Sequence, residues 1–572
     1  MNYMERYKSW LKDKNIDEKT KEELKKISDE KEIQDRFYKD LEFGTAGLRG
    51  KLGAGTNRMN IYTVSKATQG FANFINKQSK EYAERGVAIA HDSRHMSKEF
   101  ALDTALIFAA NGIKAFLFED LRPTPELSFS ILHLKTAGGI VITASHNPKE
   151  YNGYKAYWED GAQITSKIAD PLTEEINNVN DFSTIKRISK EEAIEKGLLK
   201  IIGKEIDDIY IEKVKKLSIT DDVDKDLCVV YTPLNGTGNK PVRRVLKERG
   251  FLNVHVVPEQ ENPDPDFTTV GYPNPEDTKA FKYSINLGKS VDADLLVATD
   301  PDCDRLAIMV KHNNEYVSFS GNQTGAILIK YIIDGLKGKN ALPKNGAIIK
   351  SIVTGDLGKR IGQENGITTF ETLTGFKNIC GKENEITKNG EYELIFGYEE
   401  SIGFKAGDFV KDKDAVISSM LLVEAAAYYK KRGKTLKDVL DGLFEEFGYY
   451  LENNFSIILE GIEGQERIKR IMKEYRNLYP KEFSGIKMIK YIDYLEMKEH
   501  DLVNNSEKET DVPKSNVLRY FFEDGSWYAL RPSGTEPKLK VYIYSIGKTM
   551  EDAKEKLNAI KEKMMEIIDS VE

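Results

Sequence analysis

The chain has 572 residues, with 84 Lys or Arg against 92 Asp or Glu, so its formal net charge at pH 7 is −8. Hydrophobic residues make up 40% and aromatic residues 10% of the chain, which is enough for packed cores and excludes a chain that is disordered throughout. At about 150 residues per domain, the length predicts roughly four domains. The acidic balance argues against bulk binding of nucleic acid, so we expect no nucleic-acid partner.

Cysteine content and hydropathy bear on the compartment. Cys228, Cys303 and Cys380 are too few for a disulfide framework and show no Cys-x-x-Cys spacing, which favours a reducing compartment. Residues 1–30 are charged throughout and lack the apolar core of a signal peptide. No apolar run approaches the roughly 18 residues of a membrane span, and the mean hydropathy is −0.49. These features predict a cytoplasmic protein with no membrane partner.

In chain order, residues 1–38 read as a charged helical lead-in, and short apolar strands that end in polar loops follow it. The expected strands are Gly86–Ala90, Gly139–Thr143, Leu295–Ala298, Ala347–Val353 and Leu394–Phe396. Strands that alternate with amphipathic helices are typical of α/β layers. Ligands bind beyond the carboxyl ends of such strands, which is where the polar loops lie.

The pattern changes after residue 450. The polar run at 499–516 is expected to be a surface loop, and the stretch RYFFEDGSWYALR (519–531) is expected to be a hairpin. An amphipathic helix is expected from about residue 549, so this part reads as a small α+β domain. We therefore predict an α/β protein of four domains: 1–205 with the lead-in, 206–318 and 319–448 as similar α/β domains, and 449–572 as an α+β domain.

The first loop whose residues suggest a chemical role is TASHNP (143–148), the serine loop. Asn147 and Pro148 favour a tight turn, and a serine placed directly after a strand projects its hydroxyl into a cleft. Ser145 could there accept or hold a transferred group, and His146 lies beside it on the same loop. The loop lacks the Gly-x-Ser-x-Gly elbow of hydrolases, so an ordinary turn serine is the alternative.

The second loop is DPDCDR (300–305). Asp300, Asp302 and Asp304 alternate in an extended loop and can converge on one hard cation, and oxygen ligands favour Mg²⁺. The loop is not an EF-hand, because the glycine at loop position 6 and the closing Glu are missing. A solvated acidic turn is the alternative, although an apolar strand follows the loop directly.

Two further turns suit a phosphorylated sugar. RPSGTEPK (531–538) offers an arginine, two hydroxyls, backbone N–H groups and a lysine, which suits a phosphate group. GYEES (397–401) offers paired acceptors and a hydroxyl, which suits sugar hydroxyls. An ordinary Pro/Gly turn and a surface acidic turn are the respective alternatives. Gly-Lys-Ser (288–290) and Gly-Lys-Thr (433–435) lack the upstream glycine of a P-loop.

Taken together and in this order, TASHNP, DPDCDR, GYEES and RPSGTEP resemble the α-D-phosphohexomutase superfamily, over residues 40–545. The opening FGTAGLRG and the long chain look more like its phosphoglucomutase and phosphopentomutase branch than the shorter bacterial phosphomannomutases. The resemblance implies four domains around a central cleft, the last of them mobile.

The resemblance also implies roles for residues on the serine and aspartate loops. Ser145 would carry a phosphoryl group, and together with Asp300, Asp302 and Asp304 it would hold Mg²⁺. The residues expected to serve phosphoryl transfer and proton handling are Arg49 in GLRG, Lys155 in YNGYK, and His146. Some relatives carry a histidine shortly after the Gly-x-Glu-Ser loop, where this chain reads Ser-Ile-Gly-Phe (401–404), so the general acid and base stay open.

The remaining implied roles concern substrate binding. Glu399 and Ser401 would bind sugar hydroxyls, with Thr374 on the glycosidic side. The residues expected at the substrate phosphate are Arg531, Ser533, Thr535 and Lys413.

The implied reaction interconverts α-D-glucose 1-phosphate and glucose 6-phosphate through a phosphoserine and glucose 1,6-bisphosphate, which would also act as activator. The expected partners are small-molecule sugar phosphates, and the expected state is a monomer or weak homodimer. Mannose or pentose phosphates stay open as substrates. A bisphosphate synthase using a donor such as 1,3-bisphosphoglycerate and a non-catalytic paralogue also stay open, although a paralogue would be expected to have lost Ser145 or one of the three aspartates.

Overall fold

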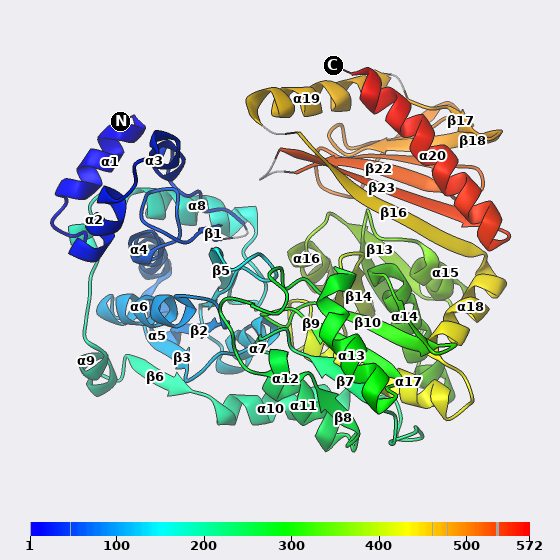
Figure 1. Ribbon diagram of the computed structural model, residues 1–572, viewed down its shortest axis with the longest axis horizontal. Helices are drawn as coiled ribbons and strands as arrows, with labels where there is room; N and C mark the ends of the chain where they lie inside the picture. The colour runs from blue at the N-terminus through cyan, green and yellow to red at the C-terminus, as the bar shows by residue number, and fades with distance from the viewer. Residues whose placement is uncertain (1, 46, 460, 478, 534–536, 572) are drawn as a thin grey trace. The chain divides into compact units, whose positions relative to one another are not determined.

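A computed structural model describes residues 2–45, 47–459, 461–477, 479–533 and 537–571 (Figure 1). The chain divides into two compact units, residues 1–324 with 401–435 and residues 325–400 with 436–572. Among the helices that the structure describes, none combines the length and apolar character that a bilayer crossing needs.

The chain before residue 38 forms the helices α1 (Tyr3–Lys12), α2 (Glu18–Lys25) and α3 (Glu30–Phe37). Asn2, Asp17 and Asp29 cap them, each accepting a hydrogen bond from a backbone N–H of the first turn. The ring of Trp10 lies 5.7 Å from that of Phe37 and 5.5 Å from that of Tyr62 on α4 (Ile61–Gln78). The lead-in is therefore packed onto the first α/β layer through an aromatic cluster.

The first sheet has six strands in the order β1-β5-β4-β2-β3-β6. The strands are β1 (Leu48–Lys51), β2 (Val87–His91), β3 (Ala115–Phe118), β4 (Gly138–Ile142), β5 (Tyr151–Trp158) and β6 (Leu199–Ile202). Neighbours from β4 to β6 are parallel, whereas β5 is antiparallel to both β4 and β1. Helices α4, α6 (Ser97–Ala110) and α8 (Ser166–Asn177) share its core. Since β2 and β4 are parallel neighbours, the loops after them emerge at one edge.

The second sheet of this unit has the order β11-β10-β9-β7-β8. Its strands are β7 (Val229–Thr232), β8 (Val254–Val256), β9 (Leu295–Thr299), β10 (Leu306–His312) and β11 (Glu315–Ser318). β7 pairs in parallel with β8 and β9, and β10 returns antiparallel to β9. The helix α17 (Ala415–Lys430) packs against this layer at α11 (Asn239–Glu248) and β9.

The second unit contains two more sheets. In the third sheet the parallel strands β13 (Thr368–Thr372), β12 (Gly346–Ser351) and β14 (Glu393–Glu399) lie side by side in that order. Helix α16 (Phe376–Thr387) packs against these strands. The expected strands at 347–353 and 394–396 therefore correspond to β12 and β14.

The fourth sheet is antiparallel, with the order β16-β23-β22-β21-β18-β19-β20 and β17 (Glu482–Phe483) beside β18. Its main strands are β16 (Tyr449–Ile458), β18 (Ile486–Asp493), β19 (Lys498–Asp501), β20 (Ser506–Glu509), β21 (Leu518–Phe522), β22 (Trp527–Pro532) and β23 (Lys538–Gly547). The helices α19 (Gly461–Asn477) and α20 (Met550–Ser570) share its core. The predicted hairpin is confirmed as β21 and β22, and the predicted last helix as α20.

The expectation of a surface loop at 499–516 is wrong for its first half, because β19 and β20 form a hairpin there. The residue composition did not predict these strands, because β20 is exposed along its whole length and has no apolar face. Cross-strand ion pairs support the hairpin instead, at 2.8 Å between Lys498 and Glu507 and 3.2 Å between Lys508 and Glu499.

Candidate active site

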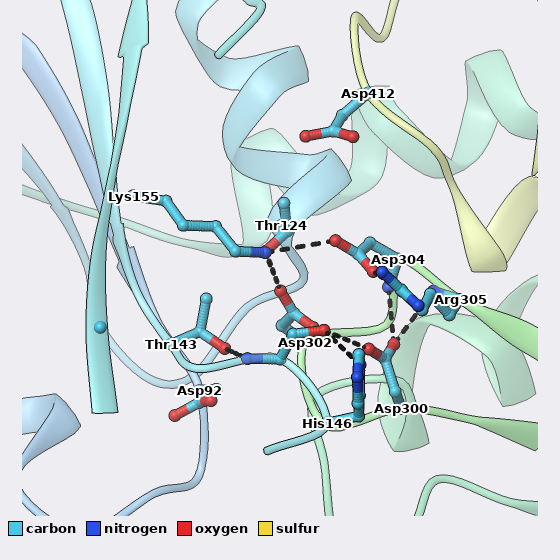
Figure 2. A network of polar contacts seen from close by, with 12 residues as sticks. Asp92, Thr124, Thr143, His146, Lys155, Asp300, Asp302, Asp304, Arg305 and Asp412 are labelled. Atoms are coloured by element: carbon cyan, nitrogen blue, oxygen red, sulfur yellow. Dashed lines mark hydrogen bonds and ion pairs between the residues drawn. The ribbon is translucent and has the colours of Figure 1, made fainter. Parts of the chain in front are cut away.

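The serine loop after β4 and the aspartate loop between β9 and β10 meet in the first unit (Figure 2). The hydroxyl of Ser145 donates a 2.8 Å hydrogen bond to Oδ2 of Asp300. Ser145 has a φ of 52°, a left-handed conformation that is uncommon for a residue with a Cβ. Its N–H donates to Oγ1 of Thr143 at 2.8 Å, which holds the turn at the strand end. The serine loop and the aspartate loop, about 155 positions apart in the chain, therefore form one site.

The three aspartates form a buried carboxylate cluster. One oxygen from each of Asp300, Asp302 and Asp304 lies within 4.8 Å of the others, and none of the three residues is more than 1% exposed. The backbone N–H groups of Asp304 and Arg305 donate to Oδ1 of Asp300. Among the described residues, none donates a hydrogen bond to Oδ1 of Asp302 or to Oδ1 of Asp304. Buried carboxylate oxygens without donors suit a hard divalent cation, so the residues present fit a metal site.

The cluster also perturbs its own ionisation. Burial, together with the negative charges of Asp302 and Asp304, raises the pKa of Asp300 well above its ordinary value. Burial acts in the same direction on Asp302, but the ammonium of Lys155 outweighs it and holds the pKa of Asp302 below its usual range. Three carboxylates are therefore costly to ionise together here unless a cation shares the site.

Two lysines flank the cluster. Nζ of Lys155, on β5, lies 2.6 Å from Oδ2 of Asp302 and 3.3 Å from Oδ2 of Asp304. Nζ of Lys413 lies 2.7 Å from the same oxygen of Asp304. Burial would lower the pKa of Lys155, but Asp302 and Asp304 outweigh it and raise that pKa. Burial would likewise lower the pKa of Lys413, but Asp304 and Asp412 raise it, so both side chains stay charged and place positive charge beside the aspartate cluster.

Besides Asp300, His146 also lies within hydrogen-bond distance of the nucleophile. Its Nδ1 lies 3.2 Å from Oγ of Ser145. Burial and the nearby charges of Arg305 and Arg49 lower the pKa of His146 well below its ordinary value. The imidazole is therefore neutral at pH 7 and can accept a proton. Arg49, on β1, is itself exposed.

Two residues at this site were missed by the sequence analysis. Thr124, the first residue of α7 (Thr124–Leu134), donates from Oγ1 to Oδ2 of Asp302 at 2.8 Å and from its N–H to the carbonyl of Asp302 at 2.9 Å. Arg94, after β2, binds backbone carbonyls of the serine loop. The only signal for Arg94 was its place in a polar loop (HDSR) behind a strand, and Thr124 had none.

The remaining predicted residues divide between the units. Glu399, at the end of β14, accepts a 2.6 Å hydrogen bond from the N–H of Gly375, the residue after Thr374, so this part of the prediction comes together in the second unit. Ser401 clusters with the first unit. In the fourth sheet Arg531 donates to the hydroxyl of Tyr542 at 3.2 Å.

The phosphate turn is described only in part. Ser533 donates from its N–H to the carbonyl of Lys538 at 2.8 Å. Thr535 lies outside the described residues.

Sequence models of four protein-family domains match this chain. The phosphoglucomutase/phosphomannomutase alpha/beta/alpha domains I, II and III match residues 40–182, 208–313 and 320–447, and the C-terminal domain of that family matches residues 494–563. The chain therefore belongs to the phosphoglucomutase/phosphomannomutase family, within the α-D-phosphohexomutase superfamily. The predicted fold class of three α/β domains followed by a C-terminal α+β domain is confirmed.

Similar proteins agree with this assignment. A phosphoglucomutase of Staphylococcus haemolyticus is 39% identical over 508 residues, covering 89% of this chain and 90% of the relative. One of Staphylococcus epidermidis is 40% identical over 516 residues, covering 90% and 92%. Among solved structures, the Paramecium phosphoglucomutase pp63/parafusin superposes with a TM-score of 0.70 at 19% identity, covering 93% of this chain and 95% of that one. A phosphoglucomutase/phosphomannomutase family protein of Burkholderia thailandensis gives 0.66 at 18% identity, covering 92% and 97%.

Proposed function

We propose that this protein is a phosphoglucomutase, which interconverts α-D-glucose 1-phosphate and glucose 6-phosphate. The observation that carries the proposal is the hydroxyl of Ser145, held 2.8 Å from Asp300 at a buried three-carboxylate cluster with Lys155 beside it. The curated phosphoglucomutases at 39% and 40% identity over about nine-tenths of the chain support glucose phosphates as substrates.

Ser145 carries a phosphoryl group in the resting enzyme. In the first transfer a sugar hydroxyl attacks the phosphorus, the bond to Oγ of Ser145 breaks, and the sugar becomes glucose 1,6-bisphosphate. After the bisphosphate reorients, Oγ attacks its other phosphate, and the product leaves with the phosphate that remains. In the first transfer the attacking sugar hydroxyl loses a proton and the serine oxygen gains one, and in the second transfer the serine oxygen loses a proton and the sugar oxygen gains one. His146, neutral and 3.2 Å from the serine oxygen, suits acceptance of the serine proton in the second transfer.

Asp300, Asp302 and Asp304 would hold Mg²⁺, together with the phosphoryl group on Ser145. When bound, Mg²⁺ supplies positive charge that stabilises the phosphoryl group during transfer. Lys155 adds to this charge, because it stays protonated between two carboxylates. Lys413, which shares Asp304 with Lys155, extends the positive charge toward the phosphate of the sugar.

The other predicted loops, GYEES (397–401) and RPSGTEPK (531–538), would bind the sugar phosphate. Glu399 accepts hydrogen bonds, as its contact with Gly375 already illustrates, and so suits sugar hydroxyls together with Thr374 and Ser401. Arg531 and Ser533 suit the phosphate that does not react, because a guanidinium binds phosphate oxygens in pairs. Thr535, although outside the described residues, belongs to the same turn.

The test is conversion of glucose 1-phosphate to glucose 6-phosphate, coupled to a dehydrogenase, in the presence of Mg²⁺ and with or without a trace of glucose 1,6-bisphosphate. We expect fast turnover that the bisphosphate stimulates and that a chelator abolishes. Turnover of ribose or mannose phosphates at a higher kcat/KM than glucose phosphates would overturn the assignment of glucose.

A further inference from the structure

The side chain of Arg94 lies at the centre of the serine loop. It comes from the turn between β2 and α6, about fifty positions before the nucleophile in the chain, and none of its side chain is exposed. Nη1 donates to the carbonyls of Pro148 and Tyr151 at 2.9 and 3.2 Å. Nη2 donates to the carbonyls of Ser145 and Asn147. One guanidinium therefore gathers four carbonyl oxygens from residues 145–151.

Arg94 is itself held in place from two sides. Asp92 accepts the backbone N–H of Arg94 at 2.9 Å, and its other oxygen lies 3.2 Å from Nε. The hydroxyl of Ser97 donates to Asp92 at 2.7 Å. On the opposite side the buried ring of Phe267 lies 4.9 Å from Cζ. The guanidinium is therefore held in place by contacts outside the serine loop as well as by the loop itself.

This arrangement determines how Ser145 is presented. A residue with a Cβ in the left-handed region costs free energy that neighbouring contacts have to offset, and the carbonyl of Ser145 is one of the four that bind Arg94. A trans peptide carries its C=O and N–H on opposite sides, so the same contact turns the N–H of His146 away from Arg94. The peptide that follows Ser145 is thus oriented by the buried guanidinium of Arg94, and the N–H that precedes it is held by Oγ1 of Thr143.

We propose that Arg94 is a positioning residue for phosphoryl transfer: its guanidinium sets the conformation of residues 145–151 and so aims Oγ of Ser145 at the aspartate cluster. The proposal rests on the proposed function, since it concerns the same serine. Arg94 touches neither the substrate nor the transferred group, and its effect passes through the backbone of the loop.

Arg94→Lys tests this role. Lysine keeps the charge, but one ammonium cannot reproduce the planar fork that reaches four carbonyls. We expect kcat to fall by about 10²-fold, because a displacement of about 1 Å at a reacting group has an effect of that size. We expect KM for glucose 1-phosphate to stay within about threefold, because the predicted substrate-binding residues lie on other loops.

Arg85→Lys is the matched control. Arg85 also donates to two backbone carbonyls, those of Lys135 and Thr136, both at 3.0 Å, and pairs with Glu159 at 2.7 Å, but none of these residues belongs to the serine loop. The kcat and KM of the Arg85→Lys variant should match those of the wild type. A loss of kcat in Arg85→Lys equal to that in Arg94→Lys would overturn the proposal, because it would show a general effect of losing an arginine.

A second readout does not depend on turnover. With Ser145 phosphorylated, the rate at which water removes the phosphate should change at least severalfold in Arg94→Lys and stay unchanged in Arg85→Lys, as measured by mass spectrometry of the intact protein. If Arg94→Lys does not fold, Asp92→Asn replaces it, and we expect a smaller fall in kcat at unchanged KM. The role of Arg94 would be overturned if the folded variant had the kcat of the wild type. It would also be overturned if kcat fell only in proportion to the fraction of molecules that are folded. Absence of turnover in the wild type would instead overturn the proposed function.

Discussion

At the scale of single residues, the site depends on one hydroxyl surrounded by charge. Ser145 is 4% exposed and contacts both Asp300 and His146. Burial keeps water from competing for a phosphoryl group held there, since water attack would turn a transferase into a phosphatase. Under the proposed function, the burial of Ser145 would therefore protect the phosphoryl group from water.

Ser145→Ala removes the oxygen that we propose as the carrier of the phosphoryl group. We expect kcat to fall by on the order of 10³-fold or more, because loss of a nucleophile removes the whole covalent route. The assay is the coupled conversion of glucose 1-phosphate, with intact mass to confirm that no phosphate is bound. Ser130→Ala is the control, because the hydroxyl of Ser130 only donates to a carbonyl within α7, at 2.7 Å. Near-wild-type turnover of Ser145→Ala would refute the role of this serine.

Asp300→Asn tests the charge balance of the cluster. Folding raises the pKa of Asp300, so this carboxylate lowers the stability of the metal-free protein as the pH rises from acid to neutral. The amide carries no charge, and we therefore expect the metal-free variant to unfold at a higher temperature than the metal-free wild type at pH 7.

Mg²⁺ should reverse that order. We expect the ion to bind the folded state and to raise the melting temperature of the wild type, whereas Asp300→Asn would lack one ligand and should show little or no shift. Calorimetry with and without Mg²⁺ measures both effects. Equal Mg²⁺-induced shifts in the two proteins would place the metal elsewhere.

At the scale of elements, the lead-in helices show how charged segments become part of a core. Their surface is polar, yet Trp10, Leu24 and Phe37 are buried and pack toward α4. Amphipathic spacing alone predicts helices, but it does not say what covers their apolar side. In the structure α4 covers this apolar side, and the lead-in is therefore a structural part of the first unit.

Trp10→Ala should therefore destabilise the first unit rather than impair chemistry. Removing a buried Trp costs about 3–5 kcal/mol, and Trp10 contacts the rings of both Phe37 and Tyr62. Thermal or urea unfolding measures the loss, and kcat per folded molecule should stay close to that of the wild type. Leu252→Ala is the control, because Leu252 is 76% exposed and should change stability little. A loss in Trp10→Ala no larger than in this control would show that the lead-in is not packed as described.

At the scale of the whole molecule, the third and fourth sheets are joined inside the second unit by a buried ionic network. Arg519, on β21, lies 2.9 Å from Glu371 on β13, and Lys350, on β12, lies 3.1 Å from the same carboxylate. The indole of Trp527 donates to Asp356 at 2.7 Å, and its ring lies 4.0 Å from the guanidinium of Arg519. These contacts connect the two layers within the second unit.

Arg519→Met tests that coupling. Burial would raise the pKa of Glu371, but Arg519 and Lys350 outweigh it and hold that pKa well below its ordinary value. Glu371 therefore contributes stability that is present at neutral pH and is lost as the pH falls through its folded-state pKa. Without Arg519, a buried carboxylate loses a partner, and we expect a destabilisation of about 3–5 kcal/mol by urea unfolding at pH 7.

The double variant Arg519→Met with Glu371→Gln should recover part of that loss, because it removes the unpaired charge as well. The single variant should also show a weaker dependence of stability on pH than the wild type. Full additivity of the two substitutions would mean that the pair does not interact.

The sequence alone determined the chemistry-bearing loops. Ser145 and the three aspartates follow apolar strands directly, and such local order survives in any fold that forms those strands. The strands, the β21–β22 hairpin and the last helix could be predicted for the same reason, because periodicity and turn residues act over a few positions. The domain boundaries at 205, 318 and 448 stay predictions.

Only the tertiary structure decided which distant residues complete the site. Arg94 reaches the serine loop, and Thr124 reaches Asp302, because strands far apart in the chain end at neighbouring edges. The β19–β20 hairpin likewise depends on pairing with β18 and on ion pairs between strands. Hydrogen bonds and charges act over a few ångströms in space, whatever the separation along the chain, so a pattern read along the sequence does not contain them.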